Sequence, residues 1–412
     1  MWLPANSSMR ILIVGINYTP ELTGIGKYSG EMAEWLVTAG HEVHVVTAPP
    51  YYPEWQVADG YSAWRYSSEI VAGVNILRCP IWVPSKPSGL KRLLHLASFA
   101  LSSLPVMLHQ LFWRPDVIIA IEPPLFCAPA ALVCARFSGA KAWLHVQDFE
   151  VDAAFELGIL RSMYLRSLVS KIESWLMRRF DKVSSISVNM VRRLIQKRLK
   201  AEKTVLFTNW VDTDAIFPLS SPSSMRLQFG IPSDAIVALY SGNMGEKQGL
   251  EIVLEAATRL IFEQDIKFVL CGDGAARQRL QQKYPDLSNV LWLPLQPLDR
   301  LNDLLNMASV HLLPQRSGAE DLVMPSKLTG MLASGRPVVA TVKEGSQIAE
   351  ILHGCGEVVE PGNVEQFVSA IIVLARDAVK CAALGENARN YALRNWARES
   401  VLQEFDRQLK GL

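Results

Sequence analysis

Residues 315–341 read Gln-Arg-Ser-Gly-Ala-Glu-Asp-Leu-Val-Met-Pro-Ser-Lys-Leu-Thr-Gly-Met-Leu-Ala-Ser-Gly-Arg-Pro-Val-Val-Ala-Thr, and the organisation of the chain is clearest around them. The apolar run 310–314 predicts a short buried strand before this stretch, and 338–340 predicts another at its end. Pro325 suits the first position of a helix because its missing N–H would be unpaired there, and Gly335 suits the position just past a helix end. Strand, helix and strand in this order predict a parallel sheet.

Ser326 and Lys327 fall in the first turn of this expected helix, at the carboxyl end of the preceding strand. Backbone N–H groups, the positive end of the helix dipole, a hydroxyl and an ammonium group can converge there on an anion. The arrangement predicts a binding site for a diphosphate.

A second loop of the same character spans Ser241–Gly249, after the expected strand 236–240. The backbone at Gly242, the amide of Asn243 and the ammonium of Lys247 could hold phosphate oxygens. The loop is not a P-loop, because GxxxxGK[ST] occurs nowhere in the chain. The strand 267–271 leads to a third turn, at Gly272. The loop Ser241–Gly249 and the turn with Ser326 and Lys327 follow strands of one sheet. The sequence therefore predicts two phosphate-facing loops along one edge.

Composition places the chain among globular α/β proteins. It has 412 residues, enough for two domains, of which half are hydrophobic and a fifth charged, and its net charge of +1 gives no bias toward nucleic acid. The six cysteines form no CxxC and no Cys/His cluster, so we expect reduced cysteines in a cytoplasmic protein.

The first half opens with a βαβ pattern. A buried strand at 10–17 is followed by a loop with Gly24 and Gly26, a helix to residue 39 and a strand at 43–47. The dinucleotide fingerprint is incomplete, because Ser29 stands where the third glycine belongs and no acid ends the second strand, so we discount NAD binding. The two glycines favour either an ordinary turn or a close approach of the backbone to a ligand, and both interpretations stay open.

Linker signals divide the chain. The segment Leu-Ser-Ser-Pro-Ser-Ser at 219–224 is the strongest of them. We predict an N-terminal domain at 9–215, a second domain at 216–385, and a C-terminal helix at 386–412. The domains are expected to be Rossmann-like and doubly wound, facing each other across a cleft. The last helix has no partner strand and could pack back on either domain, the N-terminal one included.

Two segments of the first half suggest contact with a membrane surface. Residues 91–114 form an expected helix that is apolar nearly all round, either an inner helix or one resting on lipid. Residues 161–203 carry twelve Lys and Arg against three acids. This excess of positive charge indicates either a solvated face or an attraction to anionic lipid. We expect no secretory signal and no membrane span, since His95, Pro105 and Gln110 interrupt the most apolar stretch.

Several polar residues are candidates for direct contact with substrate. His145 lies in the expected strand 143–146 and Asp148 lies just beyond it, where both could hold or orient a substrate. Glu320 and Asp321 could bind hydroxyl groups of a ligand, or could be solvated loop residues.

Aromatic side chains are frequent in the loop 49–68 and suit sugar stacking, although the pattern also fits a surface loop held in place by its own aromatics. Asp212-Thr213-Asp214 has the form of a metal-binding DxD, but its place after a strand favours helix capping. No carboxylate or histidine cluster suggests a metal site, so we expect no metal cofactor.

The order of these motifs resembles glycosyltransferase family 4 over nearly the whole chain. The motifs are Gly40-His-Glu-Val, Asn209-Trp-Val-Asp-x4-Phe-Pro, Ser241-Gly-Asn-x3-Lys, Gly272-Asp-Gly and Pro325-Ser-Lys-x7-Gly-Arg-Pro-Val. Longer strings are more specific and resemble a branch of this family that acts in exopolysaccharide (colanic acid) biosynthesis. These strings lie at 15–28, 48–55 and 319–328.

The resemblance implies a GT-B fold and a metal-independent glycosyl transfer with retention of the anomeric configuration. It implies a nucleotide-sugar donor bound mainly by the C-terminal domain, 216–385, and an acceptor bound by the N-terminal domain, 9–215. The colanic acid context favours GDP-fucose as the donor. The implied acceptor is an undecaprenyl-diphosphate-linked sugar. The protein would then be cytoplasmic and peripheral at the inner face of the cell membrane.

The sequence departs from the family pattern at the expected donor site. Lys247 matches the diphosphate-binding lysine of the family, but Asn243 stands near the place of a usual arginine, and Lys327 could replace that charge. Gly330 stands where the family has a glutamate that binds ribose. These departures leave two alternatives open: a non-catalytic scaffold of a membrane-bound polysaccharide assembly, or another GT-B enzyme, such as one using a UDP-sugar, an epimerase or a phosphorylase.

Overall fold

The computed structural model describes the chain from residue 8 onward, except for residues 23, 86–87, 124, 150–162 and 317–323. The contacts divide it into two compact units. One unit comprises Met1–Thr208 together with Leu402–Leu412, and the other comprises Asn209–Val401.

The N-terminal unit is built on an eight-stranded sheet in the order β3-β4-β2-β1-β5-β6-β7-β8. All pairings are parallel except that of β3 with β4. The long apolar runs of the central strands fit this arrangement, because parallel strands are buried on both faces. The strands are β1 (Arg10–Val14), β2 (Glu42–Thr47), β3 (Ser67–Val71), β4 (Val74–Arg78), β5 (Val117–Glu122), β6 (Lys141–Val146), β7 (Lys182–Ser185) and β8 (Thr204–Leu206).

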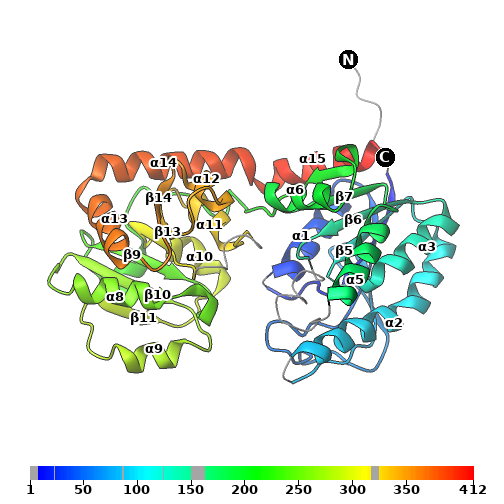
Figure 1. Ribbon diagram of the computed structural model, residues 1–412, viewed down its shortest axis with the longest axis horizontal. Coiled ribbons are helices and arrows are strands. Elements are labelled where there is room, and N and C mark those ends of the chain that lie inside the picture. The colour runs from blue at the N-terminus through cyan, green and yellow to red at the C-terminus, as the bar shows by residue number, and fades with distance from the viewer. Residues whose placement is uncertain (1–7, 23, 86–87, 124, 150–162, 317–323) are drawn as a thin grey trace, which may run out of the picture. The chain divides into compact units, whose positions relative to one another are not determined.

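Four helices cover one face of this sheet, because their buried side chains share a single hydrophobic core with alternate residues of β1, β5 and β6. Figure 1 shows two of them, α2 and α3, side by side. Helix α1 (Gly24–Thr38) precedes β2. The four helices are α2 (Gly89–Trp113), α3 (Ala128–Ser138), α5 (Met163–Met177) and α6 (Val188–Gln196).

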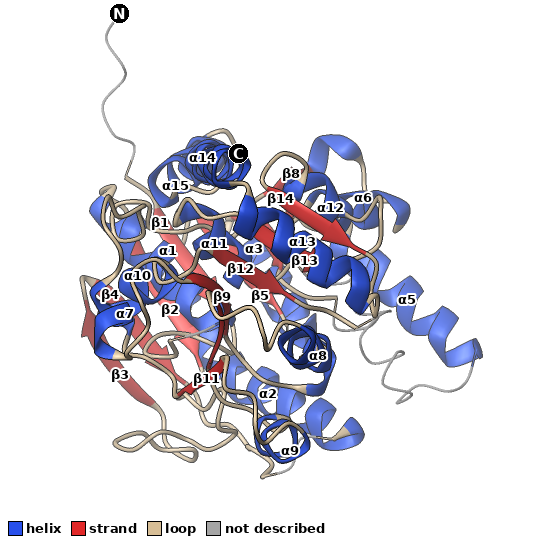
Figure 2. Cartoon of the chain, turned by 90° about the vertical axis from the view of Figure 1, so that its left-hand side faces the viewer, coloured by secondary structure: helices blue, strands red, loops and turns tan. Residues whose placement is uncertain are grey.

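The C-terminal unit has a six-stranded sheet in the order β11-β10-β9-β12-β13-β14, with every pairing parallel. The strand order reverses its direction between β9 and β12, which is where doubly wound sheets bind ligands beyond the carboxyl ends of their strands. Figure 2 shows these strands among their helices. The strands are β9 (Ile236–Ser241), β10 (Ile266–Cys271), β11 (Val290–Leu293), β12 (Val310–Leu313), β13 (Val338–Thr341) and β14 (Gly356–Val359).

Helices lie on both faces of this second sheet. On one side α8 (Glu251–Arg259) and α13 (Val364–Arg376) share a core, and on the other α11 (Lys327–Ala333) and α12 (Gln347–Leu352) share another. The remaining helices of the unit include α7 (Ser224–Gln228), α9 (Arg277–Lys283) and α10 (Leu301–Leu305). The sequence-based prediction of two doubly wound α/β domains is confirmed.

The expected single C-terminal helix is wrong: the segment forms α14 (Ala378–Asn395) and α15 (Arg398–Lys410). The break has a clear cause. The N–H of Val211 donates to the carbonyl of Trp396, and the N–H of Arg398 donates to the carbonyl of Val211, so one residue pair is held in a parallel bridge instead of a helix. Helix α15 then places Phe405 against Trp143, with ring centroids 5.0 Å apart, inside the N-terminal unit.

The expectation that no segment is long and apolar enough to span a membrane is also wrong. By length and composition helix α2 could span a membrane, and only 28% of its most apolar 18-residue segment is buried. Pro105 lies within the helix, and the polar His95 and Gln110 are buried on its inner side. None of the three residues interrupts the helix. Leu96 and Phe99 belong to the core, so one face of α2 is a part of this fold.

Candidate active site

Lys327 is the best-defined element of the site. It is the first residue of α11, with Ser326 as the N-cap, two residues later than the start expected from Pro325. The N–H of Leu328 already donates to the carbonyl of Pro325, which explains why the proline looked like a helix start. The helix ends at Ala333, just before Gly335.

The ammonium group of Lys327 lies over the carboxyl end of β9. Its Nζ is 4.2 Å from the centroid of the Tyr240 ring, and its Cδ would lie 3.5 Å from a Cβ placed on Gly242. Within the described part of the chain Lys327 has no carboxylate partner. Burial lowers the pKa of Lys327 from 10.5 to about 7, since removing an ammonium from water disfavours its charged form. An anion bound here would restore that charge.

Glycines let two turns of the C-terminal sheet touch at this place. Gly272 and Gly274 have φ values of 145° and 153°, which side chains rarely adopt. A Cβ on Gly272 would overlap the backbone oxygen of Gly242, and one on Gly274 would lie 2.6 Å from that of Met244. The N–H of Gly242 donates to Cys271, and that of Met244 donates to Asp273. The turns after β9 and β10 therefore form one packed edge.

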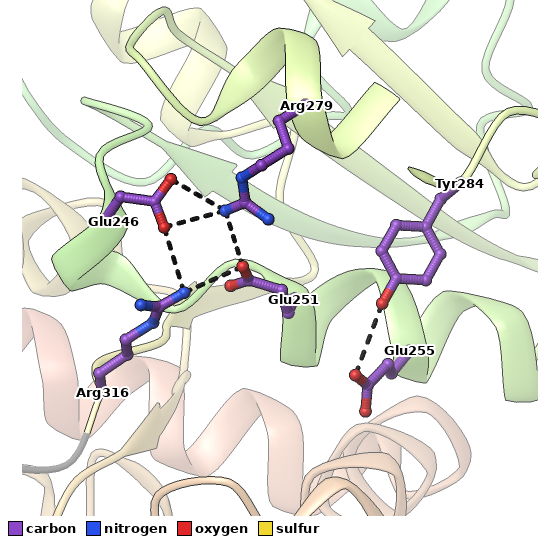
Figure 3. A network of polar contacts seen from close by, with 6 residues as sticks. All are labelled: Glu246, Glu251, Glu255, Arg279, Tyr284 and Arg316. Carbon is purple, nitrogen blue, oxygen red and sulfur yellow. Dashed lines mark hydrogen bonds and ion pairs between the residues drawn. The ribbon is translucent and has the colours of Figure 1, made fainter. Parts of the chain in front are cut away.

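Figure 3 shows an ion-pair cluster that connects this edge to the loop after β12. Arg279 donates to both oxygens of Glu246, at 2.9 Å, and to Glu251 at 2.8 Å. Arg316 donates to the same two carboxylates, at 3.2 and 3.0 Å. The cluster therefore joins the turn Glu246–Gln248, the start of α8, helix α9 and the loop after β12.

We expect Arg316→Gln to lower the free energy of unfolding by less than about 1 kcal/mol, because ion pairs between solvent-accessible side chains are weak and Arg279 still pairs with both acids. The change should be measurable in urea at low salt and should vanish at high salt, since screening removes such interactions. A larger loss that persists at high salt would show that Arg316 acts through packing instead.

Not every predicted donor-site residue lies within the described residues. Lys247 belongs to the turn Glu246–Gln248, but its side chain lies outside them, as do Glu320 and Asp321 entirely. Asn243 is exposed, and its backbone oxygen accepts a hydrogen bond from the hydroxyl of Tyr240. The donor-binding roles of these residues stay predictions.

Two glutamines at the same edge escaped the sequence reasoning. The side-chain oxygens Oε1 of Gln248 and Gln315 are buried and have no hydrogen-bond partner in the part of the chain that the structure describes. Gln315 lies beyond β12, where its backbone N–H donates to the hydroxyl of Thr341 at 2.8 Å. A buried acceptor without a donor costs about 1–3 kcal/mol, so each oxygen is suited to receive a hydrogen bond from a ligand hydroxyl.

Glu21 organises the first loop of the N-terminal unit. Its carboxylate accepts from the N–H groups of Tyr51 and Tyr52, at 3.1 and 3.0 Å, and from the amide of Asn17 at 3.0 Å. Burial raises its pKa, against the effect of these hydrogen bonds. A Cβ on Gly26 would lie 2.6 Å from a Glu21 oxygen. The close approach at Gly26 is therefore to Glu21, which links the aromatic loop to the start of α1. Gly24 and Gly26 both lie in the first turn of this helix, not in the loop expected from the sequence.

His145 is buried, and both of its ring nitrogens are engaged. Nδ1 lies 2.8 Å from the hydroxyl of Ser184, and Nε2 accepts from the amide of Gln147 at 3.0 Å. Burial lowers its pKa to about 3, so the ring is neutral. This geometry fits a packing role better than contact with substrate. Asp148 lies two residues beyond β6 and is partly exposed, as a substrate contact requires.

Asp212 caps a turn, as its sequence position favours. Its Oδ1 accepts from the N–H groups of Asp214 and Ala215, both at 3.1 Å, and its Oδ2 pairs with Arg398 at 2.9 Å. Among the described residues no three His, Cys, Asp or Glu side chains gather as a metal site would require.

Both halves of the chain match glycosyltransferase family models. Residues 23–210 match the glycosyl transferase 4-like domain, and residues 235–377 match glycosyl transferases group 1. The chain is 44% identical to the putative colanic acid biosynthesis glycosyl transferase WcaI of Escherichia coli K12, over 98% of this chain and all of that protein. It is 22% identical to the N-acetyl-alpha-D-glucosaminyl L-malate synthase of Bacillus anthracis, over 96% of each chain.

Solved structures share the fold at low identity. A sucrose-phosphate synthase from Thermosynechococcus elongatus superposes with a TM-score of 0.75 at 16% identity, covering 98% of each chain. Anabaena Alr3699/HepE in complex with UDP-glucose gives 0.69 at 16% identity, over 98% of this chain and all of that one. The two parallel sheets, the two family models and the WcaI relative agree, so this chain belongs to the glycosyltransferases of the GT-B fold that combine a 4-like domain with a group 1 domain.

Proposed function

We propose that this enzyme is a retaining, metal-independent hexosyltransferase that moves a sugar from a nucleotide-sugar to a polyprenyl-diphosphate-linked acceptor in exopolysaccharide (colanic acid) biosynthesis. The similarity to WcaI, a putative colanic acid biosynthesis glycosyl transferase, supports the pathway. The colanic acid context favours GDP-fucose as donor, with a UDP-sugar as the alternative that the HepE complex suggests.

The observation that carries the proposal is the lone ammonium of Lys327 over a glycine-lined turn. Lys327, the backbone of Gly242 and, by its place in the turn, Lys247 would face the donor diphosphate at the carboxyl end of β9. The ribose hydroxyls would donate to the buried oxygens of Gln248 and Gln315, which supply the acceptors that Gly330 cannot.

The reaction moves negative charge onto the departing diphosphate. The bond from the anomeric carbon to the phosphate oxygen breaks, an acceptor hydroxyl bonds to the same face of that carbon, and its proton passes to the leaving phosphate. Lys327 and Lys247 would stabilise this charge in a site poor in water, and one such group is typically worth about 10²–10³ in rate. No protein base is needed, and Asp148 would orient sugar hydroxyls.

The acceptor places the enzyme at a membrane. A polyprenyl-diphosphate-linked sugar is anchored in the lipid, so the enzyme would be cytoplasmic and peripheral at the inner face of the cell membrane. The N-terminal unit, with its aromatic loop tied down by Glu21, would bind the acceptor.

The proposal is tested by thermal stabilisation of the purified protein with GDP, UDP, GDP-fucose and UDP-glucose. A ligand at a hundredfold excess over its Kd stabilises the folded state by about 2.7 kcal/mol, a shift of several degrees for a domain of this size. We expect one nucleotide pair to stabilise the wild type and Lys247→Ala to lose that shift.

Lys283→Ala is the matched control, because Lys283 is an exposed lysine of the same unit whose ammonium lies over the Tyr284 ring. It should keep the full shift. If none of the four ligands stabilises the wild type, transfer from these donors is refuted and the scaffold alternative, favoured by Gly330, takes its place. If one of the donors does stabilise the wild type, turnover of that donor with a lipid-linked acceptor would establish the transferase activity.

A further inference from the structure

One side of the N-terminal unit carries a long apolar stripe. The large side chains of α2 that remain exposed recur at intervals of three, four and seven residues, the spacing of a single helix face. Phe112 at the end of the stripe is 85% exposed. The stripe consists of Leu90, Leu94, Leu101, Leu104, Leu108 and Phe112.

Neighbouring helices extend this apolar surface. Helix α3, which packs against α2, exposes Val133 and Phe137, the latter 76% exposed. Helix α5 exposes Tyr164, Leu168, Ile172 and Trp175, again at helical spacing. Because α2, α3 and α5 bury their opposite sides in one core, all of these side chains lie on the outer side of one helical layer.

The charge of the same layer is strongly one-sided. Within their bounds, α2, α3, α5 and α6 carry a single carboxylate, Glu173, which is fully buried and paired with Lys197 at 2.5 Å. They carry seven basic residues: Lys91, Arg92, Arg136, Arg166, Lys171, Arg192 and Arg193. By contrast, α1 and α15 mix acids and bases: α1 has Lys27 with Glu31 and Glu34.

We propose that the outer side of the α2–α3–α5–α6 layer docks on an anionic phospholipid bilayer, with the α2 stripe lying in the headgroup region. An apolar helix face with basic flanks binds in this way, because apolar area enters the acyl boundary while Lys and Arg meet lipid phosphates. At about 1.5 Å per residue, the 25 residues of α2 give a helix roughly 40 Å long, which would lie along the membrane surface. Trp175 and Tyr164 suit the headgroup level, where aromatic residues with a polar tip gather.

The charge also argues against a second copy of this chain as the occupant. Two identical layers facing each other would bring like charges together, with no carboxylate in the outer faces of these helices to compensate. The inference deepens the proposed function, since it names the surface by which the enzyme reaches a lipid-linked acceptor. It does not depend on which donor is used.

The test is co-sedimentation of the full chain with vesicles of phosphatidylcholine alone or mixed with phosphatidylglycerol. We expect binding to the mixed vesicles, weakened by salt. The triple variant Leu101→Ser, Leu108→Ser, Phe112→Ser should bind roughly tenfold more weakly or worse, since each lost side chain removes apolar area from the bilayer. The matched control, Leu227→Ser, Phe262→Ser, Val379→Ser, removes three apolar side chains of the C-terminal unit that are on average more exposed than those of the stripe, and it should bind as wild type.

A charge variant tests the second half of the inference. Lys91→Gln with Lys171→Gln should weaken binding to anionic vesicles roughly fivefold per residue and should leave any binding to phosphatidylcholine unchanged. Circular dichroism melting verifies that each variant folds, which is expected because the changed side chains are exposed.

Three outcomes would overturn the inference: equal binding of the apolar triple variant and the wild type, no preference for anionic vesicles, or a wild-type dimer in sedimentation velocity that the triple variant dissociates. The last result would assign the stripe to a second copy. Vesicle binding without any stabilisation by nucleotide would support this inference and refute the transferase proposal. Stabilisation by nucleotide without vesicle binding would refute this inference and support the transferase proposal.

Discussion

Replacing Lys327 by methionine is expected to lower kcat for glycosyl transfer by about 10²–10³-fold, the usual effect of removing one charge-stabilising group from a leaving-group site. The same variant should melt at a higher temperature than the wild type. In the wild type the ammonium of Lys327 is buried over the Tyr240 ring and has no carboxylate partner in the described chain, so its charge destabilises the folded state. Methionine has a similar shape and carries no charge.

The effect of pH follows from the pKa of about 7 that Lys327 has without ligand. Above pH 7 the free enzyme loses the ammonium, so kcat/KM for the donor should fall as pH rises, and this fall should be absent in the methionine variant. Stability has the opposite dependence. Between pH 7 and 10.5 the unfolded chain binds more protons at Lys327, so the stability of the wild type rises with pH and the advantage of the variant shrinks.

Lys283→Met is the control for both measurements, because it removes an exposed lysine that lies 5.2 Å from an aromatic centroid in the same unit. It should change neither kcat nor its pH dependence. A Lys327→Met enzyme with wild-type kcat would exclude Lys327 from stabilising the leaving group, and a lower melting temperature would show that its ammonium has a partner in the folded protein.

Gly272→Ala is expected to destabilise the C-terminal unit by about 2–6 kcal/mol, the sum of a backbone conformation that only glycine adopts readily and an overpacked contact. At φ 145° an alanine is strained, and its Cβ would overlap the Gly242 oxygen. The turn that carries Asn243 must then shift, so nucleotide stabilisation should be lost together with stability. Urea unfolding and thermal shift with nucleotide measure the two effects.

Gly230→Ala separates the contact from the backbone. Gly230 also has a positive φ, of 67°, but a Cβ there meets nothing within 4 Å. Alanine tolerates this left-handed region at a cost of about 1–2 kcal/mol, so Gly230→Ala should be mildly destabilising and should keep its response to nucleotide. Equal losses in the two variants would show that the turns after β9 and β10 do not depend on their close packing.

The fold class and the positions of the central strands could be predicted from the amino-acid pattern alone. The strands expected at 310–314 and 338–340 correspond to β12 and β13 to within one residue, because strands inside a parallel sheet are buried on both faces and are rich in apolar residues. The order of the motifs also identified the glycosyltransferase family correctly. It placed Lys327 at the end of a strand beside a glycine turn, since carboxyl ends of parallel strands meet at one edge.

Which polar groups can contact a ligand depends on long-range packing and could not be predicted from the pattern. His145 looked available at a strand end, but Ser184 and Gln147 occupy its nitrogens, and Ser184 lies on a distant part of the chain. Likewise the C-terminal segment is helical by propensity throughout, yet the bridge between Val211 and Ala397 breaks it. Local pattern reports which side of an element is apolar. It does not report a partner that long-range folding brings to a particular atom.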